Sequence, residues 1–152
     1  YLTNHKLVDE IHMTGSDKTF ESIVDGPGEQ GMENKKLDLR LNQKPITCEL
    51  GCVSPVIVVP GNWSERDFDY QSKNILSMLG FNEGYTCCAL RILILPKQWE
   101  GSKKLILKIK ALMEKYKLNS NFYPGTKERI ETVRQHYPSI IEIGVHDDTH
   151  QP

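Results

Sequence analysis

A cysteine on a glycine turn and a glutamate at the end of a strand are the side chains in this sequence whose types could do chemistry together. The turn Gly84–Cys88 directly precedes an apolar segment, so its thiol can be exposed to a substrate while the scaffold stays rigid. A thiolate is a nucleophile, and a carboxylate such as Glu49 can act as its base or activate a water molecule. On spacing alone, a lone glutamate and a lone cysteine are more often structural.

The elements that must position these residues alternate between strands and helices. The β-branched run Val56–Val59 predicts a strand buried on both faces of a parallel sheet, and Cys88–Leu95 predicts another strand. Lys103–Tyr116 carries apolar residues on one stripe and lysines opposite, which predicts an amphipathic helix. The predicted fold class is therefore α/β, a mostly parallel twisted sheet with flanking helices. In such a sheet ligands bind beyond the carboxyl ends of strands, and Glu49 occupies one such end.

Shorter patterns predict the remaining elements. Helix-start signals of the N-cap type precede two helices. These helices are Lys18–Val24, after Ser16 or Asp17, and Phe68–Leu79, after Ser64 and Asp67. The other predicted elements are strands at Val8–Met13, Ile46–Leu50 and Ile140–Ile143, a short helix from Thr126 to Val133, and loops at Asp25–Asn34 and Asn119–Gly125.

Composition and charge exclude several classes of protein. The 152 residues are 38% hydrophobic and 26% charged, with a formal net charge of −1. These values argue against a disordered charged tail and against general affinity for nucleic acid or anionic membranes. The apolar runs are far shorter than the roughly 18 residues that span a bilayer. We therefore expect no nucleic-acid partner and no membrane partner.

The cysteines match no redox or zinc motif. Cys48 and Cys52 are separated by three residues, and Cys87 and Cys88 are adjacent. Neither spacing is that of a CxxC motif, and four cysteines are too few for a disulfide scaffold. This pattern favours buried, inert thiols in a reducing compartment and predicts a cytoplasmic location.

Three segments together resemble one enzyme family. Cys48–Pro55 reads CELGCVSP and resembles the ELGGKSP segment of the aldehyde dehydrogenase superfamily. Phe81–Ala89 reads FNEGYTCCA and resembles its FNQGQxCxA segment, and Met13–Ser16 reads MTGS and resembles its FTGS turn. The three occur in the family's order and at roughly its spacing. The sequence is therefore identified as a divergent member of this superfamily.

The resemblance implies a reaction and its two catalytic residues. Cys87 matches the nucleophile, whose thiolate attacks an aldehyde carbon to give a thiohemiacetal, and hydride loss to NAD or NADP then gives a thioester. Glu49 matches the general base that activates the water hydrolysing this thioester. A backbone N–H at Cys87 would stabilise the oxyanion. The implied function is NAD(P)-dependent oxidation of an aldehyde to a carboxylic acid.

The resemblance also implies a cofactor site and partners. Gly15 and Ser16 match the turn near the phosphates of the nicotinamide cofactor, where glycine permits close backbone approach and a helix N-terminus favours anions. Leu50 and Gly51 match the backbone stretch beside the nicotinamide. The cofactor is NAD or NADP, and no metal is implied. The implied partners are an aldehyde substrate and, in the intact protein, further copies of the same chain.

The sequence differs from the family pattern in several motif residues and in the part of the family's length that it matches. The second glycine of ELGG is Cys52, the motif lysine is Val53, and the two motif glutamines are Glu83 and Tyr85. The early cofactor-binding elements of the family are not located, so the chain resembles an interior piece that we expect to be inactive alone or to need a partner chain. The expected domains are the end of an NAD(P)-binding Rossmann-like domain at 1–48, the first part of a catalytic thiol domain at 49–144, and a polar tail at 145–152.

Three alternatives stay open. The chain could be a non-catalytic fold remnant that acts as a binding or regulatory module, which Val53, Glu83 and Tyr85 favour. An acylating dehydrogenase is a second alternative, although such relatives often lack the carboxylate that Glu49 supplies. A metal site over His146–His150 is the third, because that run holds four potential ligands in five residues.

Overall fold

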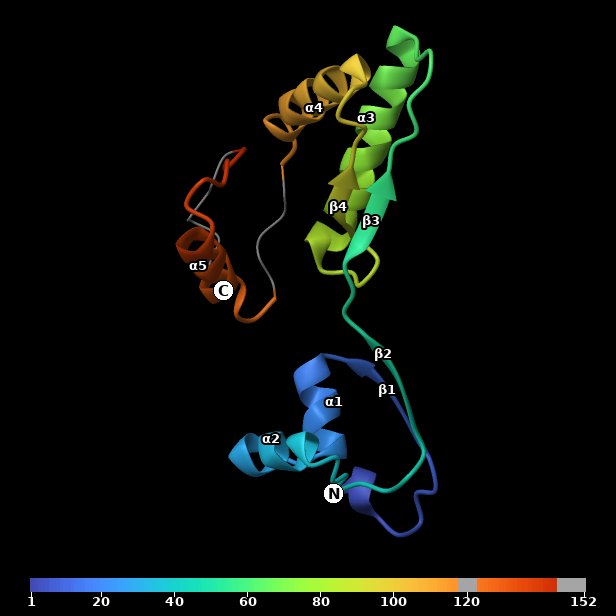
Figure 1. Ribbon diagram of the computed structural model, residues 1–152, viewed down its shortest axis with the longest axis vertical. Coiled ribbons are helices and arrows are strands. Elements are labelled where there is room, and N and C mark those ends of the chain that lie inside the picture. The colour runs from blue at the N-terminus through green and yellow to red at the C-terminus, as the bar shows by residue number, and fades with distance from the viewer. Residues whose placement is uncertain (118–122, 145–152) are drawn as a thin grey trace. The chain divides into compact units, whose positions relative to one another are not determined.

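The computed structural model of the chain describes residues 1–117 and 123–144 and divides it into two units, Tyr1–Cys52 and Val53–Pro152. The fold class is α/β, as predicted, because parallel strands are connected and flanked by helices (Figure 1). Within the described residues the strands form two separate pairs rather than one sheet. The first unit ends at Cys52, whereas the predicted domain boundary follows residue 48. The predicted tail at 145–152, the metal alternative within it, and most of the predicted loop Asn119–Gly125 lie outside the described residues.

Two helices connect two parallel strands in the first unit. Its elements are the 3₁₀ helix η1 (Leu2–Asn4), strand β1 (Ile11–Gly15), helices α1 (Asp17–Val24) and α2 (Gly28–Lys36), and strand β2 (Ile46–Leu50). Strand β2 and helix α1 confirm the predictions at these positions, whereas β1 begins later than the predicted Val8. A parallel pair needs a long connection between its strands, which α1 and α2 supply.

Helix α2 shows that the predicted loop over Asp25–Asn34 is wrong. The glycines of this segment predict a turn, but Gly31 is buried inside the helix. A Cβ atom at Gly31 would lie 1.8 Å from the carbonyl oxygen of Gly26, so only glycine allows the helix to approach the preceding turn. Gly26 itself has a φ of +108°, which lets the chain enter the helix at this angle. The glycines therefore serve close backbone packing.

The second unit contains a second parallel pair and three α-helices within its described residues. Its elements are β3 (Ser54–Ile57), α3 (Glu65–Gly80), the 3₁₀ helix η2 (Phe81–Gly84), β4 (Leu90–Ile94), α4 (Glu100–Met113) and α5 (Thr126–His136). The predicted start of α3 is confirmed, because Ser64 and Asp67 form a reciprocal capping box. The predicted helices at α4 and α5 are confirmed as well.

The core of the second unit lies between the strand pair and the helices α3 and α4. It consists of Val58, Phe68, Ile75, Leu90, Leu105 and Ile109. Helix α3 lies along the strand pair in Figure 1, and α4 packs against α3. This packing supports the segment between α3 and β4, which carries Cys87.

One burial prediction and one strand prediction in this unit are wrong. The segment Val56–Val59 is not buried on both faces, because Ile57 and Val59 are 67% and 72% exposed while Val58 is buried. Among the described residues, the helices cover only the face of the pair that points to the core. Ile140–Ile143 forms no strand, because the Ile140 N–H donates to the Tyr137 carbonyl in a turn.

Candidate active site

The register of β1 and β2 brings four of the predicted site residues together in the first unit. Thr14 pairs with Glu49 and Gly15 pairs with Leu50, so Gly15 and Glu49 lie at the carboxyl end of the pair. Both residues are exposed. Ser16 directly follows Gly15 in the chain, which places it at the same edge. The proposed base and part of the proposed cofactor turn are therefore neighbours at the edge where α/β sheets bind ligands.

Ser16 shapes this edge through the start of α1. Its Oγ accepts a hydrogen bond of 3.1 Å from the N–H of Thr19 and lies 3.0 Å from the Thr19 hydroxyl. This is the N-cap interaction expected from the sequence, and it fixes the direction in which α1 leaves the strand. The serine side chain thus orders the turn, while Gly15 keeps the adjacent backbone accessible.

Gly51 lies beyond β2 and borders open space. A Cβ atom built on this glycine would meet nothing within 4 Å. The same test at Gly15 finds a single contact, the methyl group of Met13 at 3.1 Å. Gly51 therefore borders open space, and at Gly15 the end of the flexible Met13 side chain is the one group within reach of an added Cβ atom.

Cys87 belongs to the second unit and follows a turn of unusual conformation. Asn82, Glu83 and Gly84 all have left-handed backbone angles, with φ values of 51°, 53° and 76°. This region is strained for a residue such as Glu83 and persists only where surrounding structure holds it. The guanidinium of Arg91, on β4, donates a hydrogen bond to the Gly84 carbonyl and supplies such a contact.

The thiol at Cys87 is exposed at the end of this turn. The Ser54 hydroxyl, at the start of β3, donates to the Cys87 carbonyl over 3.4 Å, and the Ala89 N–H donates to the Thr86 carbonyl over 3.1 Å. The backbone around Cys87 is thus contacted by Ser54 of β3 and by Ala89, the residue before β4. This arrangement can present a thiol to a substrate from a supported turn.

The prediction that the cysteines are buried is wrong. Cys48, Cys52, Cys87 and Cys88 all have exposed side chains. Cys88, which was expected to contribute to packing, is exposed because the chain enters the core only at Ala89 and Leu90. Exposure by itself therefore does not distinguish Cys87 from the other thiols.

Sequence reasoning missed the residues that support the thiol turn. Arg91 and Ser54 contact its carbonyls, and Tyr123 and Thr126 contact the Tyr85 side chain. Ser54 is 33 positions from Cys87 and Thr126 is 41 positions from Tyr85, so residue spacing does not reveal these contacts, although Ser54 is the serine of the CELGCVSP segment. Arg91 lies only seven residues from Gly84. The alternation of β4 is a partial signal for Arg91, since a charged residue stands there in an otherwise apolar strand.

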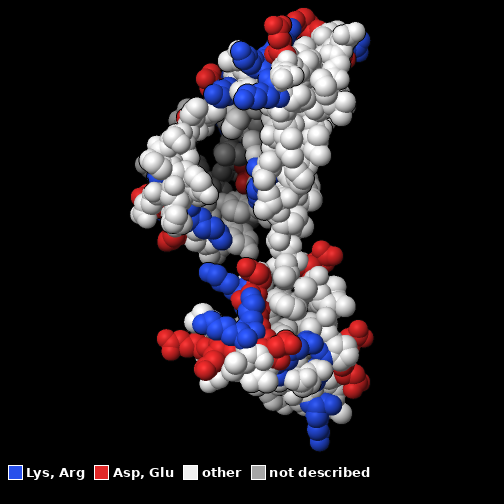
Figure 2. Space-filling view, in the orientation of Figure 1, with Lys and Arg blue, Asp and Glu red and all other residues white. Residues whose placement is uncertain are grey.

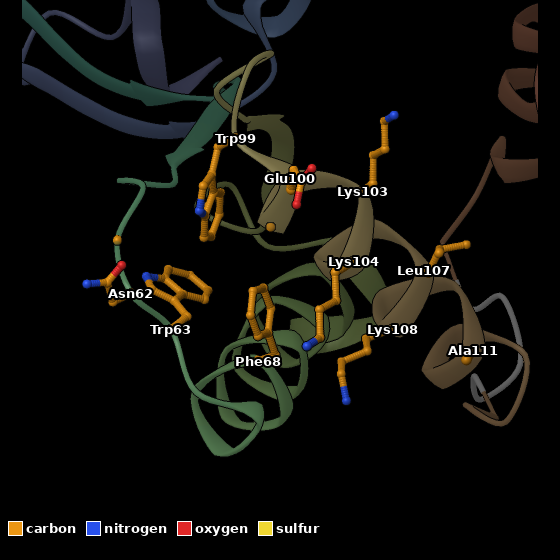
Figure 3. Close-up of a pocket in the computed structure, with 12 residues that line it drawn as sticks. Asn62, Trp63, Phe68, Trp99, Glu100, Lys103, Lys104, Leu107, Lys108 and Ala111 are labelled. Carbon is orange, nitrogen blue, oxygen red and sulfur yellow. The ribbon is translucent and has the colours of Figure 1, made fainter.

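A shallow cavity of about 750 Å³ lies elsewhere in the second unit, between the Gly61–Phe68 segment and α4. Three aromatic rings converge at it, and Figure 3 shows Trp63, Phe68 and Trp99 beside one another, with Lys104 next to Phe68. The Trp63 and Trp99 centroids are 4.9 Å apart, and the Lys104 Nζ lies 4.6 Å from the Phe68 centroid. The cavity includes none of the predicted site residues.

The lysines of α4 are matched by acidic groups on α3. Figure 2 shows basic side chains gathered over α4, whose sequence contains Lys103, Lys104, Lys108 and Lys110. A hydrogen bond from Lys104 lowers the pKa of Glu65, and one from Lys108 lowers the pKa of Asp69. The same bond to Asp69 raises the pKa of Lys108. These pairs join α3 to α4 and neutralise part of the basic surface.

The described residues contain neither a cluster of metal-binding side chains nor a helix that could span a membrane. In 1–117 and 123–144, no three His, Cys, Asp or Glu side chains are grouped closely enough to hold a metal ion. No helix in the same part of the chain is long and apolar enough to cross a bilayer.

Comparisons with known proteins point to one family. The chain matches the aldehyde dehydrogenase family over residues 1–129. It is 33% identical over 88 residues to an aldehyde dehydrogenase of Enchytraeus buchholzi, a match that covers 58% of this chain and 15% of the relative. It is 27% identical over 142 residues to a protein of Antirrhinum majus named mitochondrial benzaldehyde dehydrogenase, covering 93% of this chain and 23% of the relative.

The fold of this chain is similar to part of a solved dehydrogenase structure. An NADP-dependent glyceraldehyde-3-phosphate dehydrogenase from Bacillus halodurans, in complex with NADP, superposes with a TM-score of 0.54 at 24% identity. The match covers 75% of this chain and 20% of that one. The chain therefore spans less than a quarter of the length of the curated relatives and of this structure. The family match over residues 1–129 confirms the resemblance carried by the three sequence segments, and the chain belongs to the aldehyde dehydrogenase family.

Proposed function

We propose that this chain supplies the nucleophile and the general base for NAD(P)-dependent oxidation of an aldehyde to a carboxylic acid. The observation that carries the proposal is the exposed thiol of Cys87 at the end of a left-handed turn whose carbonyls are held by Arg91 and Ser54. Within the aldehyde dehydrogenase family, the position three residues after the glycine of this turn matches the nucleophile. Glu49 is the proposed base, exposed at the carboxyl end of β2.

The edge of the first unit fits a dinucleotide cofactor. Gly15 and Gly51 leave the backbone open, Leu50 lies opposite Gly15, and Ser16 orders the N-terminus of α1, where backbone N–H groups favour phosphate. When bound, NAD⁺ or NADP⁺ supplies the hydride acceptor. In this proposal the first unit is the end of the cofactor domain, although Glu49 and Gly51 fall within it rather than in the second unit.

The residues of this chain carry the remaining steps. The Cys87 thiolate adds to the aldehyde carbon, and the former carbonyl oxygen becomes an oxyanion that the Cys87 backbone N–H stabilises. Loss of hydride leaves the acyl group on Cys87 as a thioester. Glu49 then takes a proton from a water molecule, whose oxygen adds to the thioester carbon. The carbon–sulfur bond breaks, and the carboxylic acid leaves with Cys87 returned to its thiolate.

The partners and location of the protein are part of the same proposal. We propose an aldehyde substrate, a homo-oligomer and a cytoplasmic location. A relative from Antirrhinum majus carries the name mitochondrial, so fractionation of source cells with cytosolic and mitochondrial markers is the direct test of the location.

Variants of the two proposed catalytic residues in the full-length protein test the function. Cys87→Ser is expected to abolish aldehyde-dependent NAD(P)H formation, while the adjacent Cys88→Ser retains it. Glu49→Gln is expected to form one equivalent of NAD(P)H in a burst and then turn over slowly, because acylation proceeds while thioester hydrolysis is impaired. Glu33→Gln, an exposed carboxylate on α2, is the matched control. Normal turnover by Cys87→Ser would favour the fold-remnant alternative.

A further inference from the structure

Tyr85 lies two residues before Cys87 and contacts a distant part of the second unit. Its phenolic oxygen is 2.8 Å from the hydroxyl oxygen of Thr126, the first residue of α5. The Thr126 hydroxyl donates its single proton to the Tyr123 carbonyl over 2.6 Å. The hydroxyls of Tyr85 and Thr126 are thus hydrogen-bonded to each other, and Thr126 also bonds the Tyr123 carbonyl. These hydrogen bonds connect the thiol turn to the start of α5.

The aromatic ring of Tyr85 makes a second contact with the same segment. The rings of Tyr85 and Tyr123 are stacked, with centroids 5.2 Å apart and planes inclined by 17°. The Arg129 guanidinium lies 5.4 Å from the Tyr123 centroid and donates to the Pro124 carbonyl over 2.7 Å. Contacts within the segment Tyr123–Arg129 thus hold it in place. Both the hydroxyl and the ring of Tyr85 contact this segment.

The backbone of Tyr85 is hydrogen-bonded to the strained turn, so the contacts of its side chain also restrain that turn. Its N–H donates to the Asn82 carbonyl over 2.9 Å, which closes the left-handed turn. Arg91 holds the Gly84 carbonyl, the next carbonyl upstream of Tyr85. The turn is therefore fixed from two directions, by Arg91 on β4 and by Tyr85 through α5.

We propose that Tyr85 is a positioning residue for Cys87, and that the segment Tyr123–Arg129 is the support through which it acts. The inference rests on the proposed function insofar as Cys87 is the nucleophile. Tyr85 stands where the family motif has glutamine, and it replaces a short amide with a ring and a hydroxyl that reach α5. A fixed turn keeps the thiol and the Cys87 N–H in one geometry, which is the requirement for an oriented attack.

Removal of the hydroxyl alone tests the positioning role. Tyr85→Phe keeps the stacked ring and loses the bond to Thr126, and Thr126→Val removes the same bond from the other side. Matched controls are Tyr70→Phe, an exposed tyrosine on α3, and Thr132→Val, within α5. Amide hydrogen exchange over residues 81–89 of this chain is expected to become about three- to tenfold faster in both test variants, the effect of losing one neutral hydrogen bond. The double variant is expected to match either single one.

A second readout connects the turn to its thiol. In the test variants, the ratio of iodoacetamide labelling rates at Cys87 and Cys88 is expected to fall toward one. In the full-length protein kcat is expected to fall with KM unchanged, which a general loss of stability would not produce once activity is corrected for the folded fraction. Unchanged exchange over 81–89 in Tyr85→Phe, or equal changes in the controls, would overturn the inference. If the unaltered chain already labels Cys87 and Cys88 equally, the proposed function fails, and the exchange result still decides the role of Tyr85.

Discussion

Leu50 lies directly opposite Gly15 in the parallel register of β1 and β2, and the preceding pair joins Glu49 to Thr14. Two motifs that are separated by more than thirty residues in the sequence therefore end at one edge of the first unit. Gly51 follows this edge with open space beside its backbone. The proposal that this edge receives a nicotinamide cofactor can be tested without reference to the thiol.

Gly51→Val is expected to weaken cofactor binding without destabilising the fold. A Cβ atom at Gly51 meets no protein atom within 4 Å, so a larger side chain would occupy only the space proposed for the cofactor. Calorimetric titration of the full-length protein with NAD⁺ and NADP⁺ measures the first effect, and thermal unfolding measures the second. Gly31→Ala is the control that is expected to lower the unfolding temperature. Its Cβ atom would lie 1.8 Å from the Gly26 carbonyl oxygen, so the fold could not accept it without a backbone shift. Unaltered affinity for both cofactors in Gly51→Val would contradict the proposed site.

Leu105→Ala is expected to destabilise the second unit by about 2–5 kcal/mol. Leu105 is completely buried in the core, so its truncation leaves a cavity between α4 and the strand pair. Leu107 lies on the same helix but is 67% exposed, which makes Leu107→Ala the matched control. Urea unfolding of this chain gives the difference, and equal losses in the two variants would show that α4 does not pack in the orientation described.

Ser64→Ala is expected to cost about 1 kcal/mol of unfolding free energy. Its hydroxyl accepts the Asp67 N–H at the start of α3, and the Asp67 carboxylate accepts the Ser64 N–H in return. The control is Ser77→Ala, which removes a hydroxyl from the exposed surface of the same helix. The comparison is made by urea unfolding at pH 7, and it fails if the control variant loses as much stability as Ser64→Ala.

The stability of the second unit is expected to decline as the pH falls below about 4.5. Hydrogen bonds from the Ser64 side chain and backbone hold the pKa of Asp67 below its usual value of 3.8. A carboxylate with a lowered folded-state pKa stabilises the fold above its unfolded value, and that contribution disappears as the pH falls through the folded pKa. Glu65 and Asp69 act in the same sense, with usual values of 4.5 and 3.8.

Lys108 on α4, the basic partner of Asp69, affects stability at high pH rather than at low pH. The raised pKa of Lys108 means that its contribution is complete below 10.5 and is lost only as the pH rises above that value. Lys108 therefore stays charged at both pH 7 and pH 3, and its titration does not contribute to the difference between the urea midpoints at these two pH values. Asp67→Asn is expected to reduce the difference between the two midpoints, and an undiminished difference would mean that Asp67 does not contribute.

Local patterns predicted the elements of this fold where one interaction type dominates. The capping residues Ser16 and Ser64 marked the starts of α1 and α3, and Ile46–Leu50 is a strand over the predicted residues. Helix α2 was missed because the need for Gly31 arises from the carbonyl of Gly26 in the folded chain. The exposed face of β3 was missed because β-branched runs report strand preference, whereas burial depends on which elements cover the strand.

In the candidate site, too, features with a local sequence signal could be predicted, whereas contacts between distant residues could not. The positions of Cys87 and Glu49 at a glycine turn and a strand end could be predicted, since turn residues and apolar runs are local signals. The support for the turn could not, because Tyr85 meets Thr126 across 41 positions of the sequence. Such contacts depend on how helices and strands pack, which residue spacing does not encode.

The most direct test of the central claim, that Cys87 is the nucleophile, is site-resolved alkylation of the four exposed cysteines. Iodoacetamide at neutral pH, followed by mass spectrometry over time, gives a separate rate for each thiol of this chain. All four cysteines are exposed, so the reagent can reach each of them, and the thiolate is the reactive form. We expect Cys87 to be labelled about tenfold faster than the adjacent Cys88. Equal rates at the two positions, or slower labelling of Cys87, would contradict the account.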